Sequence, residues 1–137
     1  MDWSYVAGFI DGEGTITFAR CRTRVGNPSL KPRIIVGQKK PEVLYLIQEK
    51  VGGGHVLQQP GGLFVWQADG LRLHLDLMSR LQPLLIIKKR QAEILVEFCK
   101  CRLAVLGGNQ TYDQHCLDLD IEMRALNLRG QPEARRT

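Results

Sequence analysis

The stretch YVAGFIDGEGTITF, from Tyr5 to Phe18, decides the fold of this 137-residue chain. Its first half is apolar and compatible with a helix, and Gly8 and Gly12, four residues apart, lie on one face of that helix. Asp11 and Glu13 follow at the C-terminal end, where the helix dipole disfavours acids by about 0.3–1 kcal/mol each. The glycines therefore predict close packing against another helix, and the acids predict a bound cation.

The rest of the chain predicts an α+β domain. Alternating apolar residues predict strands at residues 15–22 and 33–38, and helical spacing predicts a helix that begins near Pro41 and ends at the glycines 52–54. Residues 55–59 and 63–67 flank Pro60-Gly61-Gly62 and read as a hairpin. Further helices are expected at about 70–81, at 89 to about 106, and from a capping box at 111–114 through Leu117, Ile121 and Leu128. The order is αββαββα with two C-terminal helices, in a single domain over residues 1–137.

Charge and composition narrow the functional classes. The net charge is +5, and residues 20–40 contain seven Lys or Arg and no acid, which is compatible with nucleic acid binding. No apolar run reaches the roughly 18 residues of a membrane helix, so we expect no membrane partner. The four cysteines form no CxxC pair, and the N-terminus has no secretory pattern. We therefore expect reduced thiols in an intracellular compartment, with a cysteine metal site as a minor alternative.

The first stretch resembles the LAGLIDADG motif of homing endonucleases, from Val6 to Gly14. Glu13 stands where the motif's last acid is usually Asp. Two later segments carry the same resemblance in the same order: Val36-Gly37-Gln38-Lys39, and LQPLLIIKKRQA from Leu81 to Ala92. The resemblance covers nearly the whole chain and is to the single-motif, homodimeric branch. It implies a four-stranded curved antiparallel sheet with the helices on one face.

Glu13 is the candidate carboxylate for a catalytic metal. Phosphodiester cleavage needs a hard cation, and Mg²⁺ prefers one or two carboxylates together with phosphate oxygens and waters. The resemblance adds the backbone carbonyl of Gly12 as a ligand. The alternative reading of Glu13 is a solvated acid at a helix end. For Asp11 we favour a structural role, in which it caps backbone groups, over metal binding.

Two more residues complete the candidate catalytic set. The resemblance implies that Gln38 hydrogen-bonds the attacking water and that Lys88 supplies positive charge at the cleavage centre. By composition alone, Gln38 also reads as a strand-end polar residue, and Lys89 and Arg90 are interchangeable with Lys88. Glu42 departs from the family, which often has a basic residue there. Either Lys39 or Lys40 substitutes for that residue, or turnover is slow.

The strands are expected to read DNA, because a two-stranded ribbon fits the major groove. If Ile16, Phe18, Ile34 and Val36 face the helices, the opposite face of the first two strands carries Thr15, Thr17, Ala19, Cys21, Lys31, Arg33 and Ile35. In the second hairpin, an inward Val56 and Val65 would turn Leu57, Gln59, Phe64 and Trp66 outward. The alternative is a register that buries both aromatics. Arg20, Arg22 and Arg24 are expected at phosphates, and Lys39 is a further candidate for DNA binding.

These observations predict a homodimeric, Mg²⁺-dependent homing endonuclease that cuts both strands of a long, near-palindromic DNA target. The expected dimer interface is the helix face with Ala7, Gly8, Asp11 and Gly12. Intron homing and an organellar or prokaryotic setting go with the resemblance. One alternative is a non-cleaving binder on the same scaffold, such as an RNA maturase or a transcriptional regulator. Another is an unrelated, monomeric α+β enzyme of phosphoryl transfer.

Overall fold

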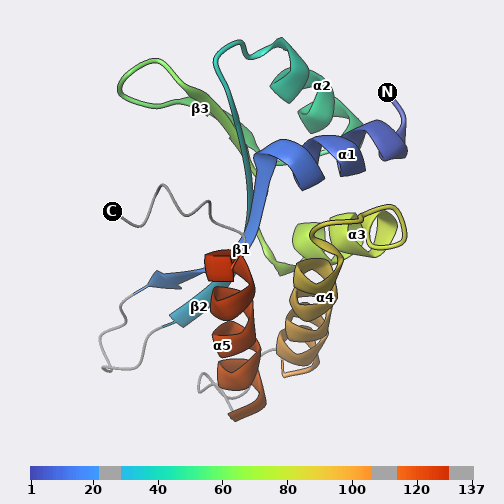
Figure 1. Cartoon of the computed structure of the whole chain (residues 1–137), viewed down its shortest axis with the longest axis vertical. Coiled ribbons are helices and arrows are strands. Elements are labelled where there is room, and N and C mark those ends of the chain that lie inside the picture. Colours follow the sequence, from blue (N-terminus) through green and yellow to red (C-terminus); the bar gives the residue numbers. More distant parts are fainter. Residues whose placement is uncertain (22–28, 106–113, 130–137) are drawn as a thin grey trace.

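The computed structural model describes residues 1–21, 29–105 and 114–129. The elements are α1 (Trp3–Glu13), β1 (Gly14–Cys21), β2 (Ser29–Gln38), α2 (Glu42–Val51), β3 (His55–Gln58), β4 (Phe64–Gln67), α3 (Leu71–Leu81), α4 (Lys89–Ala104) and α5 (Gln114–Arg129) (Figure 1). The predicted α+β order is therefore confirmed. The capping box expected at residues 111–114 lies outside the described residues except for Gln114.

The four strands form one antiparallel sheet in the order β1-β2-β4-β3. The long β1–β2 pair runs from Gly14 opposite Val36 to Cys21 opposite Ser29. β4 pairs with only the last four residues of β2, from Ile35 to Gln38. The N-terminal half of β2 consequently extends beyond β4 and has β1 as its sheet neighbour.

The helices cover one face of this sheet, because one side of each strand is apolar. Ile16, Phe18, Ile34 and Val36 are buried in a single core with residues of all five helices, as the alternation of β1 and β2 predicted. Phe18 packs against Phe98 of α4 with ring centroids 4.6 Å apart. Burial of this inner face leaves the opposite, outer face of the sheet without a helix.

The expectation that Phe64 and Trp66 point outward is wrong. Trp66 lies opposite Val36 on one side and Val56 on the other, so it shares their inner face and is fully buried. Its Nε1–H donates to the carbonyl of Gly53 at 3.1 Å. The inner position of Val56 is correct, but Val65 lies on the outer face. The three consecutive apolar residues Phe64, Val65 and Trp66 show no alternation that could indicate which of them faces inward, so the sheet pairing decides it.

The hairpin around Pro60-Gly61-Gly62 is confirmed. Gln59 N–H donates to the Leu63 carbonyl at 2.7 Å, and both glycines have positive φ. Among the described residues, no helix combines the length and the apolar composition that a membrane-spanning segment needs.

Candidate functional site

The C-terminal end of α1 passes straight into β1 without a loop (Figure 1). Gly14 makes this junction possible, because a Cβ on it would lie 2.9 Å from the carbonyl oxygen of Ile10. The junction leaves Glu13 exposed as the last residue of the helix. Glu13 forms no ion pair with the described residues, so its carboxylate is available to a ligand.

Asp11, two residues earlier, is used internally. Its buried carboxylate accepts the backbone N–H of Ile86 at 2.7 Å and that of Lys88 at 2.9 Å. These donors belong to the turn that leads into α4, where backbone N–H groups have no partner within the helix. Asp11 therefore joins the end of α1 to the start of α4. This contact agrees with the capping role favoured from the sequence, although the capped turn is 75 residues away.

Lys88 reaches the same end of α1. Its ammonium donates to the backbone carbonyl of Asp11 at 2.5 Å, where the negative end of the helix dipole favours a cation. The structure also separates Lys88 from its neighbours in the basic run. Lys89 is exposed, and Arg90 forms a two-pronged ion pair with Glu122 of α5, at 2.7 and 2.9 Å. This bond raises the pKa of Arg90 and lowers that of Glu122.

Gln38 approaches Glu13 from the sheet. It ends β2 opposite Phe64 and is half-buried on the inner face. Together with the exposed side of α1 it lines a shallow depression, formed by Ser4, Tyr5, Gly8, Phe9, Gly12, Glu13 and Gln38. The depression brings two of the three candidate catalytic residues together, and Lys88 lies at the helix end beside it. Sequence order alone could not show this proximity, because the three come from α1, β2 and the turn before α4.

The donor set at this end of α1 fits a hard cation in part. Glu13 supplies one free carboxylate, and the carbonyl of Gly12 is adjacent to it. Within the described ranges no group of three or more His, Cys, Asp or Glu residues could hold a metal alone. Mg²⁺ is commonly bound through one or two carboxylates plus phosphate oxygens and waters, so one carboxylate per chain is compatible with a site completed by substrate.

The outer face of the sheet carries several of the residues predicted to face DNA. Thr15, Ile35, Gln67 and His55 form one row across all four strands. Toward the N-terminal end of β2, Thr17 lies opposite Arg33 and Ala19 lies opposite Lys31 on the same face. Both cations are exposed. Gln59 is exposed in the hairpin loop. The side chain of Cys21, together with Arg22 and Arg24, lies outside the described residues.

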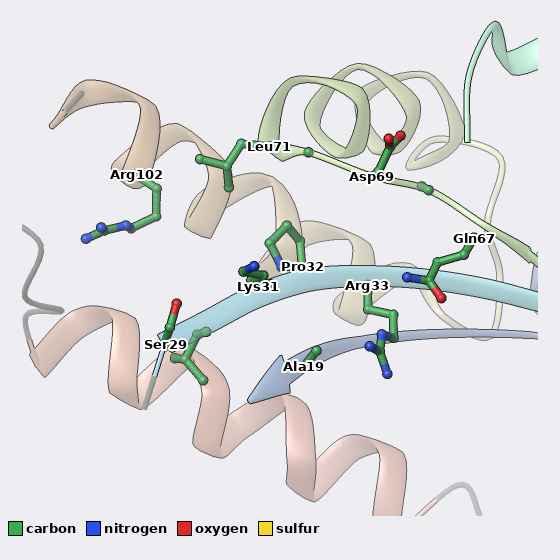
Figure 2. Close-up of a pocket in the computed structure, with 12 residues that line it drawn as sticks. Ala19, Ser29, Lys31, Pro32, Arg33, Gln67, Asp69, Leu71 and Arg102 are labelled. Atoms are coloured by element: carbon green, nitrogen blue, oxygen red, sulfur yellow. The ribbon is translucent and has the colours of Figure 1, made fainter. Parts of the chain in front are cut away.

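Beyond the reach of β4, a cavity of about 570 Å³ opens beside β2. Figure 2 shows Lys31 and Arg33 on β2, Arg102 on α4, and Asp69 on the segment that follows β4. Three cations and one carboxylate give this cavity a net positive charge. It therefore extends the basic end of the outer face and is suited to an anion such as a phosphate.

No protein-family model matches the sequence, and no curated protein sequence matches it either. Solved structures do match. The archaeal intron-encoded homing endonuclease I-Vdi141I, complexed with DNA, has a TM-score of 0.77 at 22% identity over 90% of this chain and 82% of that chain. The homing endonuclease I-CvuI, in complex with its target in the presence of Ca, has a TM-score of 0.75 at 19% identity over 90% and 80%.

The LAGLIDADG homing endonuclease I-GzeII, in complex with a DNA target, has a TM-score of 0.74 at 17% identity, over 91% of this chain and 44% of that chain. The chain has the LAGLIDADG homing-endonuclease fold. The motif that gives this fold its name is α1 itself with Gly14, the first residue of β1.

The LAGLIDADG helix exposes a narrower face than the sequence predicted. Gly8 and Gly12 are exposed, and a Cβ on either would meet nothing within 4 Å. Ala7 and Asp11, in contrast, are buried within the chain, at 1% and 9% exposure. The open face consists of the two glycines with Ser4 and Tyr5. Ala7 and Asp11 pack against their own chain, so Gly8 and Gly12 are the members of the predicted interface that remain exposed.

Arg20 is also placed differently from the prediction. It follows Phe18 by two residues and so lies on the inner side of β1, where it forms an ion pair with the buried Asp120 of α5. Arg124 is a second partner of Asp120, at 3.3 Å. Arg20 thus fastens α5 to the sheet of the LAGLIDADG fold and is not part of the outer face.

Glu42 has a structural reason to be acidic. It is the first residue of α2, where the helix dipole favours a negative charge. Lys39 and Lys40 are exposed in the bend immediately before it. A cation therefore remains close to Gln38 even though position 42 is acidic.

Cys99 is poorly suited to a metal or redox site. It is buried in α4, and burial raises the pKa of its thiol to about 12. A thiol that stays protonated is a poor ligand and a poor nucleophile. The minor alternative of a cysteine metal site gains no support from Cys99.

Proposed function

We propose that this protein is a homodimeric, Mg²⁺-dependent endonuclease that cuts both strands of a long, near-palindromic DNA site. The observation that supports the proposal is that Glu13 and Gln38 line one depression along α1, while Lys88 donates to the Asp11 carbonyl at the end of the same helix. Metal-dependent hydrolysis of a phosphodiester can use a free carboxylate to hold the cation, an amide to orient water and an ammonium group to stabilise the developing charge. The solved structures of the same fold in complex with DNA support the choice of substrate.

In the proposed mechanism each residue has a separate task. Glu13, with the Gly12 carbonyl, would hold the cation, which supplies Lewis-acid stabilisation of the charge that develops on the scissile phosphate. Gln38 orients the attacking water through its amide. Lys88 places positive charge beside the phosphate or the leaving oxygen. Asp11 holds Lys88 in position through the turn that it caps.

A two-fold dimer would complete the site, because one chain offers one carboxylate and a double-strand cut needs two centres. The exposed glycine face of α1 permits close approach of a second α1. Ile86 and Ile87, at 86% and 72% exposure, lie on the turn that Asp11 holds against the same helix end. They would add apolar area to that interface. In I-GzeII the match covers 44% of the chain, which leaves room for a second unit of this size.

The test is Glu13→Gln, an uncharged side chain of nearly the same size. DNA sites are selected from a randomised plasmid library with Mg²⁺, and binding and cleavage of a selected site are then measured separately. Binding should change little, while cleavage should fall by about 100-fold or more, as when other transition-state stabilising groups are removed. Glu49→Gln, an exposed acid of α2, is the matched control and should cut normally.

Other outcomes separate the alternatives. Cutting by Glu13→Gln at the wild-type rate would remove Glu13 from the mechanism. Binding without any double-strand cut by the wild-type protein would support a binder on the same scaffold. A monomer in light scattering that selects no two-fold DNA site would support an unrelated enzyme.

A further inference from the structure

The outer face of the sheet carries an apolar patch close to the candidate catalytic centre. The patch consists of Ile35, Leu57, Leu63 and Val65. Val65 lies opposite Gly37 on β2 and Leu57 on β3, so all three share this face. Gly37 has no side chain, and a Cβ on it would lie 3.3 Å from Leu63 Cδ2. Leu63 therefore packs over the glycine and completes the patch.

The patch is partly exposed although its members are apolar. Leu57 is 57% exposed and Leu63 40%, and Ile35 is half-buried. Val65 is only 4% exposed, and it does not belong to the helix-covered core. A solvated sheet face would ordinarily carry polar residues at these positions. A contiguous exposed apolar surface is typical of a binding site.

The position of the patch selects its partner. The outer face of β2 changes character along the strand. It is apolar around Gly37 and Ile35 and becomes basic at Arg33 and Lys31. At about 3.3 Å per residue, the six steps from residue 37 to residue 31 span about 20 Å. This length matches about six base pairs at roughly 3.4 Å each. A surface that becomes basic along such a length is more complementary to the major groove of DNA than to the surface of another protein.

Within the major groove, one base offers an apolar group. Thymine carries a 5-methyl group there, which aliphatic side chains contact, whereas guanine offers acceptors to arginine and lysine. We propose that the apolar patch recognises thymine through its methyl group at the two or so base pairs nearest the cleavage centre of each half-site. Lys31 and Arg33 serve the outer base pairs. This inference rests on the proposed function and adds the base preference of the inner half-site.

The test begins with selection of bound duplexes from a randomised library in the presence of Ca²⁺, without any requirement for cleavage. Failure to select any sequence would contradict DNA recognition itself. If a site is selected, each thymine is replaced by deoxyuridine, which lacks only the methyl group. We expect each uracil at an inner position to weaken binding by about four-fold, and the same single replacement in both half-sites by about sixteen-fold. Uracil at outer positions should have no effect.

Leu57→Ser connects the effect to the patch. This variant should discriminate less between the thymine and uracil sites than the wild type does, because the most exposed side chain of the patch is gone. Leu128→Ser is the matched control, since Leu128 on α5 is 58% exposed and lies far from β3 in the sequence. It should keep the wild-type preference. Inner positions without thymine, or a Leu57→Ser variant that still discriminates as the wild type does, would overturn the inference while leaving DNA binding intact.

Discussion

At the residue scale, Asp11 and Glu13 show how two acids of one motif acquire different roles. They are separated by one residue, so they leave the helix in different directions. Asp11 points into the protein and accepts two backbone N–H groups of the turn before α4. Glu13 points into solvent and has no such partner among the described residues. The motif explains why acids are present, but only packing of the turn against α1 decides which acid stays free.

His74 is a buried residue whose contribution to the free energy of unfolding depends on pH. It is buried in α3, and the Gly70 carbonyl accepts a hydrogen bond from Nδ1 at 2.6 Å, which leaves Nε2 buried without a partner in the described residues. Burial is the largest cause of its lowered pKa, opposed by the bond to Gly70 and by the charge of Asp69. His74 therefore stays neutral in the folded protein under conditions that protonate it in the unfolded chain.

We expect the stability of the protein to fall on acidification below about pH 6.5, the usual pKa of His in an unfolded chain. There the unfolded state binds one proton more, so the free energy of unfolding drops by up to about 1.4 kcal/mol per pH unit. Above that pH, His74 is neutral in both states and contributes no slope. Urea denaturation of wild type and His74→Gln between pH 5 and 8 measures this. The free energy of unfolding of His74→Gln should depend less on pH than that of the wild type, whereas the control His115→Gln, at an exposed site, should keep the wild-type dependence. Equal slopes for wild type and His74→Gln would exclude His74 as the cause.

At the element scale, the glycines that end α2 let the hairpin of β3 and β4 pack closely against this helix. Gly52, Gly53 and Gly54 connect α2 to β3, and the indole of Trp66 lies against them. Gln48 of α2 donates to the Gly54 carbonyl at 2.9 Å. This contact also explains why Trp66 turns inward, because its only polar atom finds a partner on the helix side of the sheet.

Gly54→Ala should be much more harmful than Gly52→Ala. Both glycines have positive φ, at 87° and 82°, so each alanine incurs about 1–2 kcal/mol of backbone strain. A Cβ at Gly54 would in addition lie 2.5 Å from Trp66 Nε1, while at Gly52 it would meet nothing within 4 Å. Displacement of the indole adds about 1–3 kcal/mol. Chemical denaturation of the two variants checks the difference; equal losses would show that the indole moves aside at no cost.

At the scale of the whole molecule, the outer face of the sheet and the exposed end of α1 are suited to different kinds of partner. The outer sheet face becomes basic along β2, and the α1 end combines an open glycine face with exposed isoleucines. The first is suited to an extended anion and the second to an apolar, close-fitting partner. A second copy of the chain at α1 would place two outer faces in line along one DNA duplex.

If the proposed dimer forms through the α1 end, the double variant Ile86→Ser with Ile87→Ser should weaken it by at least about ten-fold, since each copy loses two apolar side chains. The stability of the isolated chain should change by no more than about 0.5 kcal/mol per site, because both residues are highly exposed in it. Sedimentation equilibrium gives the dissociation constant. Ile121→Ser with Leu128→Ser, on the exposed side of α5, is the control. Equal dissociation constants for the two double variants would place the interface elsewhere.

The element order and the inner face of β1 and β2 could be predicted from the sequence, because alternation and glycine or proline breaks are local signals. The phase of β4 could not, since Phe64, Val65 and Trp66 are all apolar and pairing with β2 chooses between them. The inward position of Arg20 could not be predicted from the sequence for a similar reason. Its charge is visible in the sequence, but Asp120, its partner, is 100 residues away.

The sequence by itself determined the LAGLIDADG helix, its glycines and its terminal acids, because these depend on neighbours within one or two turns. The tertiary structure decided which acid is free, which of three basic residues reaches the end of α1, and which residues form the outer face. Those outcomes depend on contacts between distant segments, and no local pattern records such contacts.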